Sequence, residues 1–422
     1  MKPISIGIAG VGNVGIEVLK QLFLSEHLGK NFLLGGVSFR SKKKKRSNDL
    51  KKVKFYNNPL DLAKDKNIDL VIELIGGSEG ISKSLAFKTL ENKKPFITAN
   101  KALIARHGIE LSLIAKKNNL FLGFEGAVAG GIPVIKVIKE SLIANKIKQI
   151  TGILNGTSNY LLDEIEKRSI DFKTALKNAQ DLGYAESDPS FDINGMDAAH
   201  KIAILSAIVF DKMPDLDNMT IRGISNITLD DLKFVDKFDY KVKMLAISNY
   251  ENNYQCSVEP WLIPKNHSLS SINGVLNAVE VMSNLSGPVL LTGAGAGGNP
   301  TASSVLSDIF DFLSKSNRTG LSNSSKNIKK IVKTKPYKNT MKFYLRATVL
   351  DKSGVLADLT SIFKQYKISI QSFYQDLKSN EKIANLFIIT HQVDRYVMSK
   401  AISKINNFKG VVKETVCISI YE

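Results

Sequence analysis

Short apolar runs alternate with amphipathic stretches over roughly the first 120 residues. The apolar runs predict strands at residues 4–9, 32–39, 68–75, 95–99 and 121–123, and the stretches between them predict helices at 14–23, 82–92 and 108–118. Largely apolar strands that alternate with helices are typical of a parallel sheet covered on both faces. We therefore expect an α/β domain over residues 1–130.

The pattern changes from Glu125 onward to glycine-rich turns, further strands such as 149–154, and several helices. This pattern predicts a mixed α/β domain over residues 131–299. Residues 314–340 carry Ser, Asn, Lys and a single Pro, which predicts a linker whose lysines (Lys326, Lys329, Lys330, Lys333 and Lys335) are solvated. The expected organisation is thus α/β and α+β, in several domains.

The last 80 or so residues, 341–422, form a pattern of their own. Strands are predicted at 342–350, 368–375, 383–391 and 411–420, and helices at 354–366 and 396–406. Their order is that of a βαββαβ module, with an antiparallel sheet and its helices on one face.

A glycine-rich loop follows the first strand directly and opens the first helix. Its sequence, Gly10-Val11-Gly12-Asn13-Val14-Gly15, fits G-x-G-x-x-G. In such a loop the first glycine allows a tight turn, the second lets a pyrophosphate approach the backbone, and the third allows close contact between helix and strand. Because the motif heads a strand–helix–strand unit, we interpret it as a dinucleotide site in a Rossmann-type domain rather than a structural turn.

The end of the second strand bears on the choice of cofactor. NAD-specific domains carry an acid there for the ribose 2′-hydroxyl, whereas this chain has Arg40 followed by lysines at 42–45 and Arg46. We expect a site for the 2′-phosphate of NADP, with Arg40 as its clamp and Ser38 or Ser41 as hydrogen-bond partners. NAD remains possible, and a solvated basic loop is the other explanation.

Composition excludes several classes of protein. With 43% hydrophobic and 23% charged residues, the chain is neither disordered nor membrane-embedded, and 422 residues imply two or three domains. The net charge of +18 would suit a nucleic-acid partner, but only eight of the 58 basic residues are Arg and no DNA-binding helix is evident, so we expect none. Two distant cysteines and a glycine-broken N-terminus predict a cytoplasmic, reduced protein.

Two polar segments lie where the pattern otherwise predicts buried structure. Asn100 and Lys101 follow a predicted parallel strand, at the sheet edge where ligands bind in such folds. Asp197 and Lys201 are four residues apart on a helix that is apolar on its other faces, which indicates a buried or cleft position.

Four acids precede or accompany that lysine: Glu186, Asp188, Asp192 and Asp197. Carboxylates can hold a substrate ammonium, and a desolvated lysine can move a proton, so the cluster suits a small zwitterionic substrate. A divalent metal site is the alternative use of clustered acids, and the nearby Lys201 disfavours it.

Together these segments resemble the homoserine dehydrogenase family, in its long bacterial type with a C-terminal ACT domain. The resemblance covers nearly the whole chain and rests on five stretches: Gly7-Ile8-Ala9-Gly10-Val11-Gly12-Asn13-Val14-Gly15, Ile97-Thr98-Ala99-Asn100-Lys101, Glu125-Gly126-Ala127-Val128-Ala129-Gly130-Gly131-Ile132-Pro133, Gly152-Ile153-Leu154-Asn155-Gly156-Thr157-Ser158-Asn159-Tyr160, and Leu182 to Pro189 running on through Asp192 to Lys201. Residues 295–303 resemble the family's late glycine-rich segment, after which a helix at about 300–313 would return to the cofactor domain.

The resemblance implies reversible reduction of L-aspartate 4-semialdehyde to L-homoserine with NAD(P)H, in the biosynthesis of threonine, methionine and isoleucine. Lys201 would be the proton donor, assisted by Lys101. The residues implied to bind the substrate are Glu186, Asp192, Asp197, Gly183, Tyr184 and Thr157. Those implied to bind the cofactor are Gly10, Gly12, Asn13, Val14, Gly15, Arg40, Asn100, Lys101 and Gly156. A monovalent cation, Na⁺ or K⁺, would be bound by Glu125, Val128, Gly130 and Ile132, partly through backbone carbonyls.

The resemblance also implies a catalytic and dimerisation domain at 131–299, a homodimer or homotetramer, and threonine as feedback inhibitor bound at the turn 351–356 of the ACT domain. An ACT domain used only for dimerisation is the alternative. Among enzymes, an aspartate-semialdehyde dehydrogenase would need a nucleophilic cysteine with a histidine partner, which Cys256 lacks. A DNA-binding sensor of NADP and amino acids is the rival outside enzymes.

Overall fold

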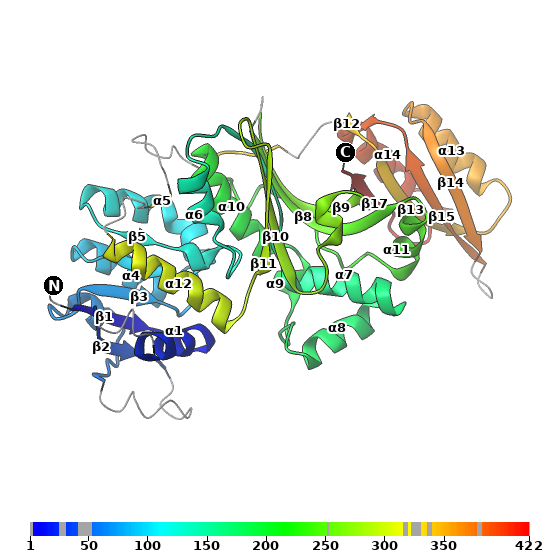
Figure 1. The fold of residues 1–422 in the computed structure, drawn as a ribbon. Coiled ribbons are helices and arrows are strands. Elements are labelled where there is room, and N and C mark those ends of the chain that lie inside the picture. The colour runs from blue at the N-terminus through cyan, green and yellow to red at the C-terminus, as the bar shows by residue number, and fades with distance from the viewer. Residues whose placement is uncertain are drawn as a thin grey trace. The chain divides into compact units, whose positions relative to one another are not determined.

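The computed structural model describes residues 3–24, 31–40, 53–250, 253–314, 320–321, 331–335, 340–377 and 382–421. Its chain divides into two compact units (Figure 1). The first comprises Met1–Leu154, Ala199–Asn218 and Asn277–Thr334, and the second Asn155–Ala198, Met219–Leu276 and Lys335–Glu422. None of the described helices is long and apolar enough to cross a membrane.

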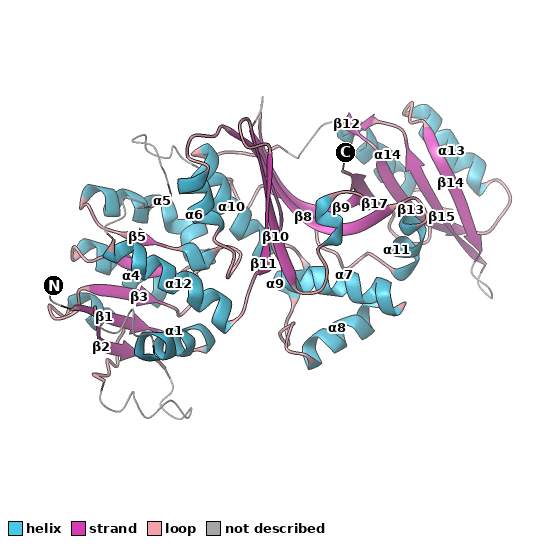
Figure 2. Cartoon of the chain, viewed as in Figure 1, coloured by secondary structure: helices cyan, strands magenta, loops and turns pink. Residues whose placement is uncertain are grey.

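The first unit contains a parallel sheet of five strands in the order β2-β1-β3-β4-β5 (Figures 1 and 2). The strands are β1 (Ile4–Ala9), β2 (Phe32–Ser38), β3 (Leu70–Glu73), β4 (Phe96–Thr98) and β5 (Leu122–Gly123). The helices that alternate with them are α1 (Asn13–Leu24), α3 (Leu60–Lys64), α4 (Ile81–Glu91) and α5 (Lys101–Lys117). The predicted Rossmann-type sheet is therefore confirmed.

The start of α5 differs from the prediction. The helix begins at Lys101 rather than at residue 108, because the Asn100 side chain caps it by accepting a hydrogen bond from the Leu103 amide at 3.1 Å. The polar segment at the end of β4 is thus a helix N-terminus, where free amides and the helix dipole favour an anionic ligand.

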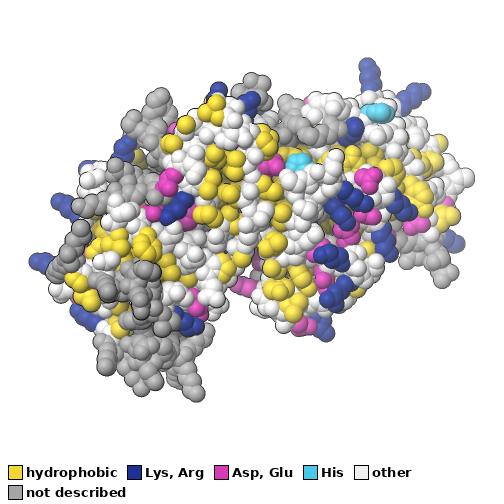
Figure 3. Space-filling model, viewed as in Figure 1, with side chains coloured by type: hydrophobic (Ala, Val, Ile, Leu, Met, Phe, Trp, Pro, Cys, Tyr) yellow, Lys and Arg dark blue, Asp and Glu magenta, His cyan; other side chains and the backbone are white. Residues whose placement is uncertain are grey.

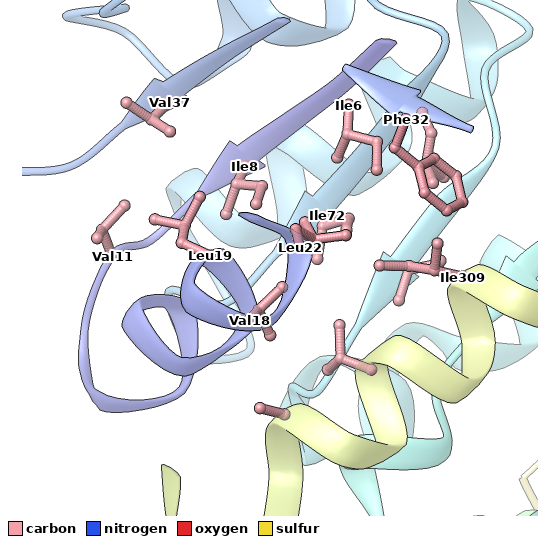
Figure 4. Close-up of a cluster of buried hydrophobic side chains, with 14 of the residues drawn as sticks. Ile6, Ile8, Val11, Val18, Leu19, Leu22, Phe32, Val37, Ile72 and Ile309 are labelled. Carbon is pink, nitrogen blue, oxygen red and sulfur yellow. The ribbon is translucent and has the colours of Figure 1, made fainter. Parts of the chain in front are cut away.

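The core of this unit lies between the sheet and helices α1 and α12 (Gly298–Leu313) (Figure 4). Ile8 of β1, Val18 and Leu19 of α1, and Ile309 of α12 belong to one cluster of buried side chains. Helix α12, at the position expected for the return helix, therefore seals the face of the sheet on which α1 lies.

The rest of the first unit is a smaller set of elements. They are the helical turns η2 (Glu125–Ala127), α6 (Val134–Lys136) and η3 (Val137–Ser141), helix α10 (Met196–Phe210) from Ala199 onward, and the strands β6 (Ile147–Ile153), β10 (Leu276–Ser283) from Asn277 onward and β11 (Pro288–Ala294). β10 lies between β6, to which it is antiparallel, and β11. Residues 201–208 of α10 are all buried, as its apolar faces predicted.

The second unit is built on a long antiparallel pair, β8 (Tyr240–Tyr250) and β9 (Tyr254–Pro264), with the short β7 (Thr220–Ile221) beside β9. Its helices are α7 (Gly156–Arg168), α8 (Phe172–Asp181), α9 (Ser190–Ile193), α11 (Leu229–Asp236) and the turn η4 (Ser268–Ser271). Helices α7 and α11 both pack against β8.

The predicted βαββαβ order is found at the C-terminal end of this unit (Figure 2). The elements are β13 (Phe343–Leu350), α13 (Val355–Gln365), β14 (Ile370–Leu377), β15 (Ile383–Thr390), α14 (Arg395–Asn406) and β17 (Val416–Ile420), with a small sheet of β12 (Thr340–Met341) and β16 (Val393–Asp394). The order β17-β13-β15-β14 is antiparallel throughout, and β17 also pairs with β9. β17 begins at Val416, later than the predicted residue 411.

The described part of segment 314–340, predicted as a linker with solvated lysines, also contains a buried residue. Leu321 is fully buried, and its amide donates to Ser112 Oγ of α5 at 3.0 Å. Lys333 and Lys335 are exposed as predicted, while Lys326, Lys329 and Lys330 lie outside the described residues. On the face shown in Figure 3, Lys and Arg side chains lie at scattered places, several beside Asp or Glu.

Candidate active site

The glycine loop has the geometry that a bound pyrophosphate requires. Gly10 has φ +101°, and a Cβ there would lie 2.4 Å from the Leu74 carbonyl oxygen. A Cβ on Gly15 would lie 2.2 Å from the Gly10 oxygen, so both positions accept only glycine. Nothing lies within 4 Å of a Cβ on Gly12, the residue before α1, and the first amides of a helix have no partner within it. The loop therefore fits a dinucleotide, approached at Gly12.

A cavity of about 250 Å³ lies beside this loop, within the first unit. It is at the carboxyl ends of β1 and β3, where the strand order reverses and where open α/β sheets bind their ligands. The cavity is lined by Val14, Leu74, Ile75, Gly76, Ala99, Asn100, Lys101, Gly126, Ala127, Gly130, Lys201, Gly295, Ala296 and Thr301. The predicted Asn100, Lys101 and Lys201 are therefore brought to one place.

The wall formed by β3 and β4 depends on Glu73, which the sequence analysis missed. Glu73 is fully buried and accepts hydrogen bonds from the amides of Ile75 (2.7 Å) and Gly76 (3.0 Å) and from Thr98 Oγ1 (2.6 Å). Asn100 adds a bond from Nδ2 to the Gly77 oxygen at 2.7 Å. The signal in the sequence that could have identified Glu73 is an acid at the end of an otherwise apolar strand.

The two cavity lysines differ in how they are held. Lys101 is the first residue of α5 and is half-buried. Lys201 is 6% exposed, and its Nζ donates to the Leu154 oxygen at 2.7 Å, just beyond the end of β6. A buried ammonium oriented by a backbone acceptor and lining the cavity suits a proton donor.

The loop 126–132 closes another side of the cavity, and it contains the carbonyls predicted to bind a cation. Ala129 and Gly130 both have positive φ, and a Cβ on Gly130 would lie 2.5 Å from the Gly295 carbonyl carbon. The Gly130 oxygen accepts a bond from Ser304 Oγ, and the Ile132 oxygen accepts one from the Val134 amide at 2.8 Å. Each of these oxygens keeps a second lone pair.

The Glu125 side chain, unlike the carbonyls of loop 126–132, is held by α6. It accepts hydrogen bonds from the Ile135 and Lys136 amides, each at 3.0 Å, and burial raises the pKa of Glu125 to about 7. Burial, reinforced by the charge of Glu125, also raises the pKa of Asp308 well above its usual value. A cation on loop 126–132 would therefore meet the Glu125 backbone carbonyl, not a free carboxylate.

Asn155, in the second unit, forms hydrogen bonds with two acids of the predicted cluster. Asn155 Nδ2 donates to Asp192 at 2.7 Å and to Asp197 at 2.8 Å, while its oxygen caps α7 by accepting from the Ser158 amide. Thr157 Oγ1 donates to the Tyr184 oxygen at 2.8 Å and approaches Asp192 at 3.4 Å. Asn155 thus holds two carboxylates together at the start of α7.

Glu186 and Asp188 do not share this amide. Both are exposed, and Asp188 accepts from the Ser190 amide at 3.1 Å; hydrogen bonds from the Ser190 side chain and amide lower the pKa of Asp188. Gly183 has φ +74° at the end of α8, and the Tyr184 ring meets the Tyr160 ring edge-on at 5.1 Å. Of the four acids, the structure therefore joins Asp192 and Asp197.

The aspartate-semialdehyde dehydrogenase alternative loses support. Burial raises the pKa of both Cys256 and Cys417 to about 12, which disfavours the thiolate that a nucleophilic cysteine requires. Across the part of the chain that the structure describes, no group of three or more His, Cys, Asp or Glu side chains could hold a metal ion.

Comparison with known proteins identifies the family. Residues 133–310 match the family model homoserine dehydrogenase, and residues 10–125 match homoserine dehydrogenase, NAD binding domain. The homoserine dehydrogenase of Neisseria gonorrhoeae is 36% identical over 98% of this chain and 97% of its own, and that of Helicobacter pylori is 38% identical over 97% of each.

Solved structures give the same result. A homoserine dehydrogenase from Thiobacillus denitrificans superposes with a TM-score of 0.89 at 34% identity, covering 100% of this chain and 99% of its own. A hyperthermophilic archaeal homoserine dehydrogenase in complex with NADPH has a TM-score of 0.65 at 25% identity, covering 74% of this chain and 98% of its own. The chain therefore belongs to the homoserine dehydrogenase family and is an NAD(P)-dependent oxidoreductase.

Proposed function

We propose that the chain reduces L-aspartate 4-semialdehyde to L-homoserine with NADPH, reversibly, and that Lys201 is the general acid of the reaction. The observation that carries this proposal is the position of Lys201, buried in the cavity beside the glycine loop with its Nζ on the Leu154 oxygen. The reaction belongs to the biosynthesis of threonine, methionine and isoleucine.

The chemistry requires one proton at the aldehyde oxygen. When bound, NADPH supplies a hydride to the aldehyde carbon. Lys201 Nζ donates its proton to the oxygen as negative charge develops there, and in the reverse direction it takes that proton back. The Leu154 carbonyl orients the ammonium by accepting one N–H, and Lys101, on the same cavity, assists through its positive charge.

The substrate's ammonium end calls for acceptors of fixed geometry. Asp192 and Asp197 share the Asn155 amide, which stabilises both carboxylates in place. We assign the binding of the substrate's ammonium end to these two acids, together with Glu186, Gly183, Tyr184 and Thr157. Gly156 and Asn100 complete the cofactor contacts of Gly10, Gly12, Asn13, Val14 and Gly15.

Arg40 supports a preference for NADP. It lies two residues after the end of β2 and is exposed, while Ser38 is buried; Ser41, the lysines at 42–45 and Arg46 lie outside the described residues. Arg40→Ala should raise the KM for NADPH roughly ten- to hundredfold and leave that for NADH nearly unchanged, since only NADPH carries the 2′-phosphate. Steady-state kinetics with both cofactors measures this, with the exposed Lys64→Ala as the control. A wild-type enzyme with higher kcat/KM for NADH contradicts the assignment.

A monovalent cation, Na⁺ or K⁺, suits the loop 126–132. Its available ligands are backbone carbonyls, those of Glu125, Val128, Gly130 and Ile132, and neutral oxygens prefer such ions to transition metals. Two consecutive positive φ values at Ala129 and Gly130 turn the chain tightly here.

The βαββαβ module at 341–422 would be an ACT domain, and 131–299 the catalytic and dimerisation domain of a homodimer or homotetramer. Threonine would bind at the turn between β13 and α13, residues 351–356. Gly354 there has φ +90°, and nothing lies within 4 Å of a Cβ placed on it, which supports close approach of a ligand to the backbone.

One assay tests the central proposal. Purified enzyme with NADPH and L-aspartate 4-semialdehyde should oxidise NADPH in proportion to the homoserine formed, and threonine should slow the rate. If no NADPH is consumed with this aldehyde, the proposed function is wrong. If turnover proceeds unaffected by threonine, only the assignment of feedback inhibition fails.

A further inference from the structure

Asn277, in strand β10, carries a buried side-chain amide that makes no hydrogen bond. The residue is 1% exposed, and neither its Nδ2 nor its Oδ1 has a hydrogen-bond partner among the residues that the structure describes. Buried polar side chains are hydrogen-bonded in the large majority of cases, so an exception calls for an explanation. The surroundings of this amide supply one.

The amide lies directly against the backbone of Gly295. A Cβ placed on Gly295 would be 1.9 Å from Asn277 Cγ and 2.0 Å from its Nδ2, so no side chain fits between the two residues. The amide thus contacts this backbone without bonding it. Only a small adjustment of the peptide groups around Gly295 separates such a contact from a hydrogen bond.

The backbone that the amide contacts belongs to residues 294–298, which we call segment 294–298. This segment forms part of the wall of the 250 Å³ cavity, through Gly295 and Ala296. It also meets the glycine loop, since a Cβ on Gly298 would lie 3.1 Å from the Asn13 oxygen. A dinucleotide bound at the glycine loop therefore lies next to segment 294–298.

Asn277 itself stands on a fixed support. The next residue of β10, Ala278, pairs with Ile153 of β6. Antiparallel pairing therefore places Asn277 opposite Leu154, the residue whose oxygen accepts the hydrogen bond from Lys201 Nζ. Asn277 and the acceptor that orients the proposed proton donor are thus held at the same end of one strand pair.

We propose that Asn277 is a positioning residue for the dinucleotide. When the cofactor occupies the cavity, the Asn277 amide forms hydrogen bonds with peptide groups of segment 294–298 and fixes this segment against the cofactor. Asn277 does not line the cavity, so it acts through the segment and touches neither cofactor nor substrate. The inference rests on the proposed function in placing the cofactor here, and it does not depend on which aldehyde is reduced.

A space-filling role for Asn277 predicts a different response to substitution. Leu has the same branched shape as Asn, and replacing an unbonded buried amide by Leu removes the cost of burying its polar atoms. If the amide only fills space, Asn277→Leu should bind NADPH as wild type does. If the amide bonds segment 294–298 in the complex, the same variant should lose affinity for NADPH without losing stability.

Thermal unfolding of the cofactor-free enzyme and fluorescence titration of NADPH, both on the full chain, test the proposal. Asn277→Leu should unfold at or above the wild-type temperature and bind NADPH about tenfold more weakly, the effect of roughly one hydrogen bond. Asn277→Ala leaves a space and should unfold at a lower temperature. Its loss of NADPH affinity should nevertheless equal that of Asn277→Leu, because both variants lack the amide.

The matched control is a buried asparagine whose amide is bonded. Asn385 of β15 is 4% exposed, and its Oδ1 accepts a hydrogen bond from Thr348 Oγ1 at 2.8 Å. Asn385→Leu leaves that hydroxyl without its partner, so it should unfold at a lower temperature and bind NADPH as wild type does. A crystal structure with NADPH should show Asn277 Nδ2 or Oδ1 within about 3.2 Å of a backbone nitrogen or oxygen of segment 294–298.

The proposal is overturned if Asn277→Leu unfolds below the wild-type temperature, since the amide is then already bonded in the cofactor-free enzyme. It is also overturned if either Asn277 variant binds NADPH as wild type does, or if the amide stays unbonded to the segment in the NADPH complex. With aldehyde turnover intact, these results remove only the role of Asn277. A wild-type enzyme that binds NADPH but reduces no aldehyde defeats the proposed function and leaves the role of Asn277 standing.

Discussion

Replacing Lys201 by Met is expected to lower kcat for aldehyde reduction about 10²–10⁴-fold, the usual contribution of a positioned general acid. Met keeps most of the side-chain volume but cannot donate a proton from the place where Nζ contacts the Leu154 oxygen. The affinity for NADPH should stay near that of wild type, because the glycine loop and Arg40 are untouched. Single-turnover rates and fluorescence titration of NADPH measure the two quantities separately.

A matched control exists in the same unit. Lys139 is 7% exposed, and its Nζ also bonds to a backbone carbonyl, that of Gly320, but it does not line the 250 Å³ cavity. Lys139→Met should therefore cost similar stability and leave kcat within a few fold of wild type. Lys201→Arg keeps the positive charge, but a guanidinium does not release its proton, so this variant should be as slow as Lys201→Met. A kcat within tenfold of wild type in Lys201→Met would exclude Lys201 as the acid.

The residues of this cavity that the sequence predicted share a local signal. Lys101 follows a short apolar strand, and Lys201 interrupts a helix that is apolar on its other faces, so each stands out within its own segment. The glycine loop has fixed spacing, and G-x-G-x-x-G between a strand and a helix is interpretable without any contact. The parallel sheet was predictable for the same reason, since strand and helix periods are local properties.

What the sequence did not reveal depends on partners far along the chain. Glu73 is an ordinary strand-end acid until Thr98 and the Ile75 amide close on it. Asn155 was noted only as part of the stretch 152–160, and its hydrogen bonds to Asp192 and Asp197 join residues about 40 positions apart. Leu321 looked like a linker residue because nothing near it in sequence shows that α5 covers it.

The largest expected loss of stability comes from Asp231, a fully buried acid of α11. It accepts hydrogen bonds from Arg346 Nε at 2.7 Å and from Tyr344 Oη, both on β13, and from the amide and hydroxyl of Thr228 at 2.7 and 2.8 Å. Burial, with the charge of Asp231, raises the pKa of Tyr344 well above its usual value, so the phenol remains a donor. One carboxylate thus ties the βαββαβ module to α11 and completes the capping box of that helix.

Asp231→Ala should lower the free energy of unfolding of the second unit by about 3–5 kcal/mol, because it leaves the Arg346 guanidinium buried and unpaired. Urea denaturation followed by circular dichroism measures the loss, and Asp230→Ala, at the neighbouring half-buried position, is the control, with a change of about 0.5 kcal/mol or less.

The double variant Asp231→Ala with Arg346→Met distinguishes the cause. If the cost is the unpaired charge, removing that charge should recover part of the loss; if it is mainly the lost helix cap, the double variant should be no more stable than Asp231→Ala alone. A loss below about 1 kcal/mol in Asp231→Ala would show that the module is held by its apolar contacts instead.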